Sequence, residues 1–266
     1  MLPFDQFPED RKKDIGFVLT DIDDTLTHKG RLIPVAYAAM ERLQQNRIRV
    51  VPVTGRPAGW CDHMARMWPI DGIVGENGAF YFRYDRNAKK MIRRYAKETT
   101  EREADREQLQ KIAEKILATV PGCRVSADQA FRVADLAIDF CEDVPPLPEK
   151  EMDRIVHIFK AAGAHVKISS IHINGWFGDY DKRTMTALFF KEIFSVELEK
   201  VKGRVLFSGD SPNDAPMFAY FPESVGMANI VAFQNRLTSL PAWVTSRQGG
   251  YGFAEMVDIL LTRRRH

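Results

Sequence analysis

Three short apolar runs in this chain each end in a cluster of acidic or small polar residues, and this repeated pattern limits its fold more than any other feature. The runs are residues 15–19 before TDIDDTLT, residues 48–53 before TGRP, and residues 204–207 before SGDSPND. Apolar runs that alternate with longer amphipathic stretches are typical of βα units in a parallel sheet. Ligands bind outside the carboxyl ends of strands in such sheets. We therefore predict an α/β fold whose three polar clusters face one crevice.

A segment with a different pattern lies between the second and third clusters and indicates an inserted domain. Its expected elements are a hairpin at 79–84 and 91–97, a charged helix at 101–120, strands near 124 and at 130–141, a helix to about residue 162, and strands at 164–173. We predict a discontinuous core domain of residues 1–84 and 179–266, with a smaller α+β domain of residues 85–178 inserted into it.

The charge balance and the cysteine spacing argue against several classes of protein. Lysine and arginine number 38 against 36 acidic residues, so the formal net charge of +2 favours no nucleic-acid partner. The three cysteines form no CxxC pair, which suits reduced thiols in the cytoplasm better than disulfides or a zinc site. No apolar run approaches the roughly 20 residues that span a bilayer, so no membrane partner is expected. The basic run at 263–265 is expected to be a solvated tail, and the oligomeric state stays open.

The first polar cluster places Asp21 and Asp23 two residues apart, with Thr25 two further on. If the preceding strand ends before Asp21, the loop brings both carboxylates near one point. A DxDxT pattern also suits a turn or a helix cap, because aspartate and threonine favour such positions. The cluster alone leaves a catalytic role and a structural role open.

The last polar cluster, at residues 209–214, combines a helix start with a carboxylate that a helix start does not need. Ser211 as N-cap, Pro212 as first helical residue and Asp214 in the first turn all suit a helix amino end. Capping does not account for Asp210, which directly follows a strand and a glycine. Bringing the carboxylates of the first and last clusters together would be costly through like-charge repulsion without a cation. Oxygen ligands without histidine or cysteine favour Mg²⁺ over Zn²⁺.

Two further features supply groups that bind phosphoryl oxygens. Thr54 and Gly55 precede a helix opened by Pro57, whose free backbone N–H groups favour an anion. An ordinary Thr-Gly turn is the alternative. Lys182 lies near the start of a later helix, where a lysine opposes the helix dipole, so local stability does not explain it. Its positive charge would offset the negative charges of the Asp21 carboxylate and of a phosphate, so that the carboxylate can attack the phosphate.

In their order along the chain, these four motifs resemble those of the haloacid dehalogenase superfamily. They are DxDxT at residues 21–25, a strand-terminal Thr54, Lys182, and GDSxND at residues 209–214. The insertion, with GENGAF at residues 75–80, looks like the type IIB cap subclass, which includes sucrose-phosphate, mannosyl-phosphoglycerate and Cof-like sugar phosphatases. One departure is Arg183, which stands where many relatives have a small residue after the lysine. The resemblance implies a Rossmann-like parallel-sheet core with an inserted type IIB cap.

The resemblance also implies a Mg²⁺-dependent phosphatase that acts on a small phosphorylated metabolite such as a sugar phosphate. Asp21 is then the nucleophile, and Asp23 protonates the leaving oxygen and later takes a proton from water. The metal would be held by the carboxylates of Asp21 and Asp210 and the carbonyl of Asp23, with Asp214 in the outer shell. The phosphoryl oxygens would be bound by Thr54, Gly55, Lys182 and Asn213.

The inserted cap would close over this site, exclude water and select the substrate. His172, Asn174 and Trp176 alternate along one expected strand and would share a face of it, where they suit the hydroxyl groups of a sugar. A half-exposed strand with an anchoring tryptophan is the alternative interpretation. Further candidates for leaving-group contacts are Arg56 and, more weakly, Arg132 and Asp135.

Two rival functions remain open at the level of sequence. A phosphomutase of the same fold would share every core residue and return the phosphoryl group to a bound sugar. A non-catalytic module that binds a ligand or a protein normally requires a lost nucleophile or metal ligand, and all four motifs are intact here.

Overall fold

The computed structural model describes residues 1–262, and the basic run at 263–265 lies outside that range. Its centre is a six-stranded parallel sheet in the order β1-β15-β14-β13-β2-β5. These strands are β1 (Leu2–Pro3), β15 (Trp243–Val244), β14 (Glu223–Gly226), β13 (Val205–Gly209), β2 (Phe17–Thr20) and β5 (Arg49–Pro52). The three apolar runs form the adjacent strands β13, β2 and β5. The predicted α/β class with a parallel-sheet core is therefore confirmed, and the three polar clusters follow neighbouring strands.

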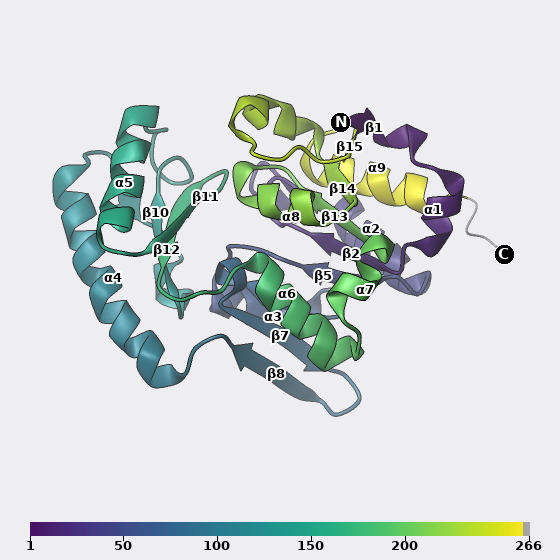
Figure 1. Cartoon of the computed structure of the whole chain (residues 1–266), viewed down its shortest axis with the longest axis horizontal. Helices are drawn as coiled ribbons and strands as arrows, with labels where there is room; N and C mark the ends of the chain where they lie inside the picture. Colours follow the sequence, from purple (N-terminus) through teal and green to yellow (C-terminus); the bar gives the residue numbers. More distant parts are fainter. Residues whose placement is uncertain (263–266) are drawn as a thin grey trace.

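Both faces of this sheet are covered by helices, as parallel sheets require. One face packs against α2 (Pro34–Gln45), α3 (Ala58–Met67) and α9 (Gly249–Leu261). The other face packs against α6 (Lys182–Phe189) and α8 (Ala215–Tyr220), which lie in front of the sheet in Figure 1. Neighbouring residues of one strand serve opposite faces, since Val18 joins the first hydrophobic cluster and Leu19 joins the second. The packing on both faces holds the carboxyl ends of the strands in fixed positions.

A second sheet lies next to β5. It consists of β6 (Ile73–Gly75), β7 (Phe80–Asp85) and β8 (Lys90–Tyr95), and a bridge from Val53 to Val74 joins it to the end of β5. The hairpin predicted at 79–84 and 91–97 is thus present, and it lies beside the core (Figure 1). The domain boundary predicted at residue 85 falls inside this hairpin. We propose that the inserted domain, called the cap below, comprises residues 97–180.

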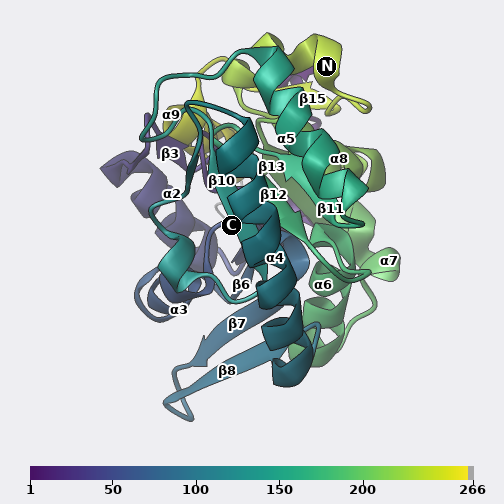
Figure 2. The same cartoon turned by 90° about the vertical axis from the view of Figure 1, so that its left-hand side faces the viewer.

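The cap is a four-stranded antiparallel sheet with two helices on its outer face (Figures 1 and 2). Its elements are β11 (His165–Ile168), β12 (His172–Trp176), β10 (Asp135–Asp139), β9 (Arg124–Val125), α4 (Thr99–Thr119) and α5 (Glu149–Ala161). Leu136, Ile138 and Ile173 pack against the two helices in a separate hydrophobic cluster. The alternate residues of β10 and β12 occupy the opposite face of the cap sheet, and this face turns toward the core.

Short elements complete the described chain. They are η1 (Phe4–Gln6), α1 (Glu9–Asp14), β3 (Thr27–His28), β4 (Arg31–Leu32), η2 (Glu76–Gly78), η3 (Gln129–Phe131), η4 (Phe190–Phe194), α7 (Leu198–Val201), η5 (Lys202–Arg204), η6 (Pro212–Asp214) and η7 (Ala228–Arg236). The strand expected at 130–141 is shorter than predicted, because η3 and the loop after it precede β10. Among the helices of residues 1–262, none has the length and apolar character needed to cross a membrane.

One close contact fixes the start of α6 against the turn η2. Gly78 has a φ of +108°, and a β-carbon there would lie 2.1 Å from the carbonyl oxygen of Asp181. Gly122 also has a positive φ, of +90°, but a β-carbon at Gly122 would have no atom of the described residues within 4 Å, apart from its immediate chain neighbours.

We expect Gly122→Ala to lower the free energy of unfolding by about 1–2 kcal/mol through backbone strain alone. Gly78→Ala should lower the free energy of unfolding by at least about 2 kcal/mol more than Gly122→Ala does, because α6 must also move. Urea unfolding checks this, and equal losses for the two variants would contradict the proposed contact.

Candidate active site

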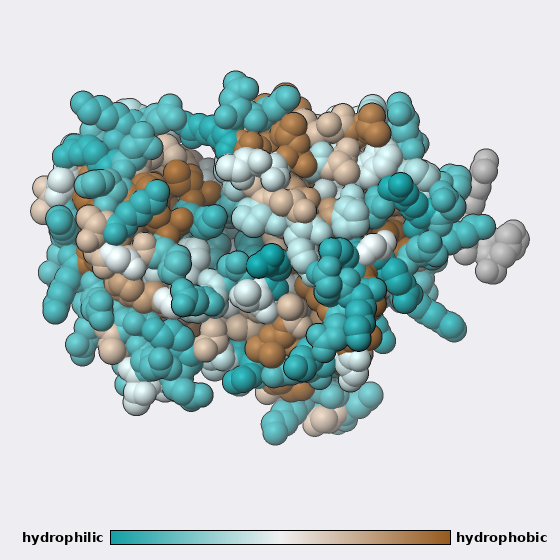
Figure 3. Space-filling model, in the orientation of Figure 1, coloured by the Kyte–Doolittle hydropathy of each residue, from teal (hydrophilic) through white to brown (hydrophobic). Residues whose placement is uncertain are grey.

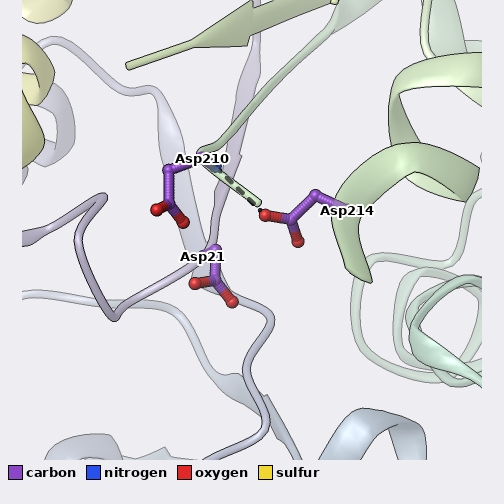
Figure 4. A group of neighbouring side chains, drawn as sticks. All are labelled: Asp21, Asp210 and Asp214. Carbon is purple, nitrogen blue, oxygen red and sulfur yellow. Dashed lines mark hydrogen bonds between the residues drawn. The ribbon is translucent and has the colours of Figure 1, made fainter. Parts of the chain in front are cut away.

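Three buried carboxylates meet at the carboxyl ends of β2 and β13. Asp21 directly follows β2, Asp210 directly follows β13, and Asp214 ends η6. One oxygen from each lies within 4.8 Å of the others, and the side chains point toward one another in Figure 4. The strand register explains this meeting, because Thr20 pairs with Ser208 and Asp21 N donates to the carbonyl oxygen of Ser208. Sequence analysis placed all three residues in one site, and they lie together.

Lys182 provides the positive charge at this cluster. It is the first residue of α6, whose N-cap Asp181 accepts a hydrogen bond from Thr184 N. The Nζ of Lys182 lies 2.9 Å from Oδ1 of Asp21 and 2.8 Å from Oδ1 of Asp214. Burial alone would lower the pKa of Lys182, but the two carboxylates raise it above the usual value. The side chain therefore stays an ammonium ion between two carboxylates.

Asp214 is saturated with hydrogen bonds from the protein itself. Its Oδ1 accepts from Lys182, and its Oδ2 accepts from the backbone N–H of Asp210 at 3.1 Å and of Ser211 at 3.4 Å. Gly209 makes room for it, since a β-carbon at Gly209 would lie 2.5 Å from Oδ2. With both oxygens engaged, Asp214 is suited to support other groups from behind. Its outer-shell role remains a prediction.

The side chains of Asp21 and Asp210 accept fewer hydrogen bonds than that of Asp214, and Oδ2 of Asp21 accepts none from the described residues. Asp210 accepts from Thr25 Oγ1 at 3.3 Å and from Asn229 Nδ2 at 2.9 Å, which orients its carboxylate. Burial raises the pKa of Asp21 to about 7, with a further rise from Asp214 that Lys182 opposes. Burial also raises the pKa of Asp210, and the Asp21 charge adds to the effect. The single charge of Lys182 does not balance three carboxylates, and an all-oxygen donor set of this kind fits Mg²⁺.

Asn229 is a contributor to this site that sequence reasoning missed. Its Nδ2 also donates to the carbonyl oxygen of Asp24, and its Oδ1 accepts from Gly249 N. It thus ties the Asp21 loop to β13 and to the start of α9. An asparagine in an irregular 3-10 segment carries no sequence signal that distinguishes it from ordinary turn asparagines.

The predicted phosphate-binding residues surround the same strand ends. Thr54 is fully buried after β5, and its Oγ1 accepts from the backbone N–H of Arg56 at 3.1 Å. Gly55 lies against the side chain of Asn77, since a β-carbon at Gly55 would be 3.3 Å from Nδ2 of Asn77. Asn213 accepts through Oδ1 from Ser211 Oγ at 2.7 Å. These contacts position the residues; their role in phosphate binding stays a prediction.

Asp23 is paired with Arg56. The Nε and Nη2 atoms of Arg56 lie 2.8–3.0 Å from the carboxylate oxygens of Asp23 in a forked arrangement. Arg56 also reaches the cap, where Nη2 donates to Glu142 Oε1 at 2.9 Å and Nη1 lies 3.4 Å from Asp128 Oδ2. Burial would raise the pKa of Glu142, yet His172 and Arg56 lower it to about 2. Arg56 therefore joins the Asp23 loop of the core to acidic residues of the cap.

The predicted leaving-group residues lie on the inner face of the cap, but most are engaged with other side chains. His172 Nε2 lies 2.9 Å from Glu142 Oε2, and Asn174 Nδ2 donates to Asp135 Oδ2 at 2.9 Å. Arg132 pairs with Asp128 and Asp135, and its Nη1 donates to the carbonyl oxygen of Gly55 at 2.9 Å. We infer that Arg132 docks the cap onto the core. Trp176 shares the strand face of His172 and Asn174, and its contacts with substrate are likewise a prediction.

Glu76 is a second residue that sequence reasoning did not single out. It is fully buried, and its carboxylate accepts from the backbone N–H of Ala58 in the core and of Val133, Ala134 and Asp135 in the cap. Burial raises the pKa of Glu76 to about 7, and the charge of Asp135 contributes. A single carboxylate thus satisfies backbone donors on both sides of the boundary between core and cap.

Residues 18–123 match the family of haloacid dehalogenase-like hydrolases. A search of curated protein sequences found no match.

Solved structures similar to this chain share its whole architecture. A protein from Thermoplasma acidophilum is 19% identical, with a TM-score of 0.69 over 92% of this chain and 98% of that one. A putative HAD/COF-like hydrolase from Plasmodium vivax is 16% identical, with a TM-score of 0.68 over 96% and 99%. The sucrose-phosphatase of Synechocystis, solved with sucrose and phosphate, is 13% identical, with a TM-score of 0.62 over 92% and 97%. At these identities the likeness shows the fold, including the cap.

Substitution of Glu76 tests whether its carboxylate stabilises the contact between core and cap. Glu76→Ala removes an acceptor from four backbone N–H groups. Each N–H left buried and unpaired costs about 1–3 kcal/mol. We therefore expect the free energy of unfolding in urea to fall by at least about 3 kcal/mol, while Glu103→Ala at an exposed position of α4 should change it by less than about 0.5 kcal/mol. Matching values for the two variants would refute this role of Glu76.

Proposed function

We propose that this chain is a haloacid dehalogenase-like hydrolase, and more specifically a Mg²⁺-dependent phosphomonoesterase that acts through a phosphorylated Asp21. The observation that supports this most strongly is the ammonium group of Lys182 between Asp21 and Asp214, with Asp210 beside them. A buried carboxylate with a paired cation and oxygens left for a metal suits attack on a phosphate anion better than a purely structural role.

Two displacements at phosphorus complete the reaction. In the first, an Asp21 oxygen forms a bond to phosphorus while the bond to the leaving alcohol breaks, and Asp23 gives that oxygen a proton. In the second, water attacks the phosphorus, Asp23 takes the proton of the water, and the Asp21 carboxylate is released with inorganic phosphate. Lys182 balances the charge of Asp21 throughout. When bound, Mg²⁺ would be held by Asp21, the Asp23 carbonyl and Asp210, and it would supply positive charge to the phosphoryl oxygens.

The pairing of Arg56 with Asp23 couples this chemistry to the cap. The guanidinium of Arg56 holds the Asp23 carboxylate in a fixed position through forked hydrogen bonds. Glu142 and Asp128 of the cap hold Arg56 in this position. We infer that Asp23 is held in this position when the cap lies over the site, as it does here.

The substrate is proposed to be a sugar phosphate or a similar small polyol phosphate. The support is the inserted cap, the polar inner face that carries His172 and Asn174, and a fold shared with a sucrose-phosphatase. The unpaired cysteines Cys61, Cys123 and Cys141 are compatible with the predicted cytoplasmic location.

Phosphate release from a panel of phosphomonoesters tests the reaction directly. We expect release with Mg²⁺ and none with a chelator. Asp21→Asn should lower the rate by at least about 10³-fold, because the nucleophile is lost. Asp153→Asn, an exposed residue of α5, serves as the matched control and should keep full activity. Release only with an added sugar bisphosphate would favour a phosphomutase, and unchanged release by Asp21→Asn would refute the mechanism.

The metal can be tested without turnover. Binding of Mg²⁺ to the folded protein at 100 times its Kd should raise the free energy of unfolding by about 2.7 kcal/mol. We expect a matching upward shift in Tm for wild type and for Asp153→Asn. Asp210→Asn should lose the shift, because it removes a proposed ligand. A shift that persists in Asp210→Asn would place the metal elsewhere.

A further inference from the structure

A small cavity between the cap and the core is unused by the mechanism above. It has a volume of about 70 Å³ and opens between β11 and β12 of the cap and α6, η6 and α8 of the core. Figure 3 shows this face of the molecule hollowed between the two lobes. The lining includes Lys182 and Asn213, so the cavity adjoins the proposed phosphoryl site.

Two buried N–H donors line this cavity and have no partner among the described residues. They are Nδ2 of Asn77, from the core, and Nε1 of Trp176, from the cap. The two residues are only 4% and 3% exposed. An unpaired donor at such burial costs free energy, so a donor of this kind calls for an acceptor that arrives from outside the chain.

The charged groups around the cavity favour a negative occupant. Lys182 contributes to its inner lining, and Lys167 and Arg183 contribute exposed side chains. Asp181 is the one carboxylate in the lining, and its Oδ1 is occupied by the N–H of Thr184. Donors and cations therefore dominate the lining. The volume holds about two water molecules, which excludes a sugar ring but admits one small oxygen-bearing group.

We propose that this cavity is a subsite for an oxyanion of the substrate, with Asn77 and Trp176 as its donors. The subsite rests on the proposed phosphatase function. Its occupant is either the non-reacting oxygens of the phosphoryl group or a carboxylate carried by the leaving group. Because one donor belongs to the core and the other to the cap, both contacts form only when the cap lies over the site. The substrate thereby stabilises the closed cap.

Two substitutions remove these donors. Trp176 stacks with Tyr180 and His165, so Trp176→Phe keeps an aromatic ring at this position and removes the indole N–H together with part of the ring system. Asn77 has a φ of +55°, which glycine adopts freely, so Asn77→Gly removes the amide without strain. Trp68→Phe, in a partly buried tryptophan of the hydrophobic core, is the matched control.

The experiment measures kcat and KM for glycerol phosphate and phosphoglycolate with Mg²⁺, and the binding of inorganic phosphate by calorimetry. Loss of one hydrogen bond to an anion should raise KM by about 10-fold in Trp176→Phe and in Asn77→Gly, with kcat changed less. If the occupant is the phosphoryl group, KM rises for both esters and phosphate binds about 10-fold more weakly. If it is a carboxylate, KM rises for phosphoglycolate alone and phosphate binding is unchanged.

Unchanged KM for both esters and unchanged phosphate binding in both variants would overturn the subsite, provided that wild type and Trp68→Phe are active. Inactivity of the wild type toward every ester would instead refute the proposed function. Because phosphate binding is measured without turnover, a failure of the subsite can be told apart from a failure of the proposed function.

Discussion

The ammonium group of Lys182, held between Asp21 and Asp214, is the interaction on which the rest of this site depends. Three carboxylates within 4.8 Å of one another cannot all be ionised in a buried place without positive charge. Lys182 supplies one such charge from the start of α6, and the donors Thr25 and Asn229 orient the Asp210 carboxylate. The remaining imbalance appears as raised pKa values for Asp21 and Asp210. We propose that this imbalance of charge favours the binding of a hard cation.

The cap is tied to this site through polar groups as well as apolar packing. The Glu76 carboxylate accepts hydrogen bonds from backbone N–H groups of both domains. Arg132 donates to the carbonyl oxygen of Gly55. Arg56 donates to Asp23 in the core and to Glu142 in the cap. Buried charges of this kind are stable only while their partners stay in place. When the cap opens, water can replace each partner, so the cost of opening is smaller than it would be for an apolar interface. An interface made in this way suits the proposed enzyme, whose cap would open and close during turnover.

The sequence allowed prediction of the parts that depend on local pattern. Apolar runs followed by Asp21, Thr54 and Asp210 identified three strands, and these strands are neighbours in the sheet. Contacts between residues far apart in the chain could not be predicted, because no local pattern connects Glu142 with Arg56 or Asn229 with Asp210. The domain boundary at residue 85 stays a prediction, since the sequence of a hairpin looks alike whether the hairpin belongs to the core or to the cap.

Direct detection of a phosphorylated Asp21 is the measurement that tests the central claim. Enzyme quenched in acid during turnover of its best ester, then digested and analysed by mass spectrometry, should yield phosphate on the peptide that contains Asp21. The modified fraction should rise within the first turnover and disappear once substrate is consumed. Phosphate on a different side chain, or full turnover with this peptide unmodified at every quench time, would contradict the account.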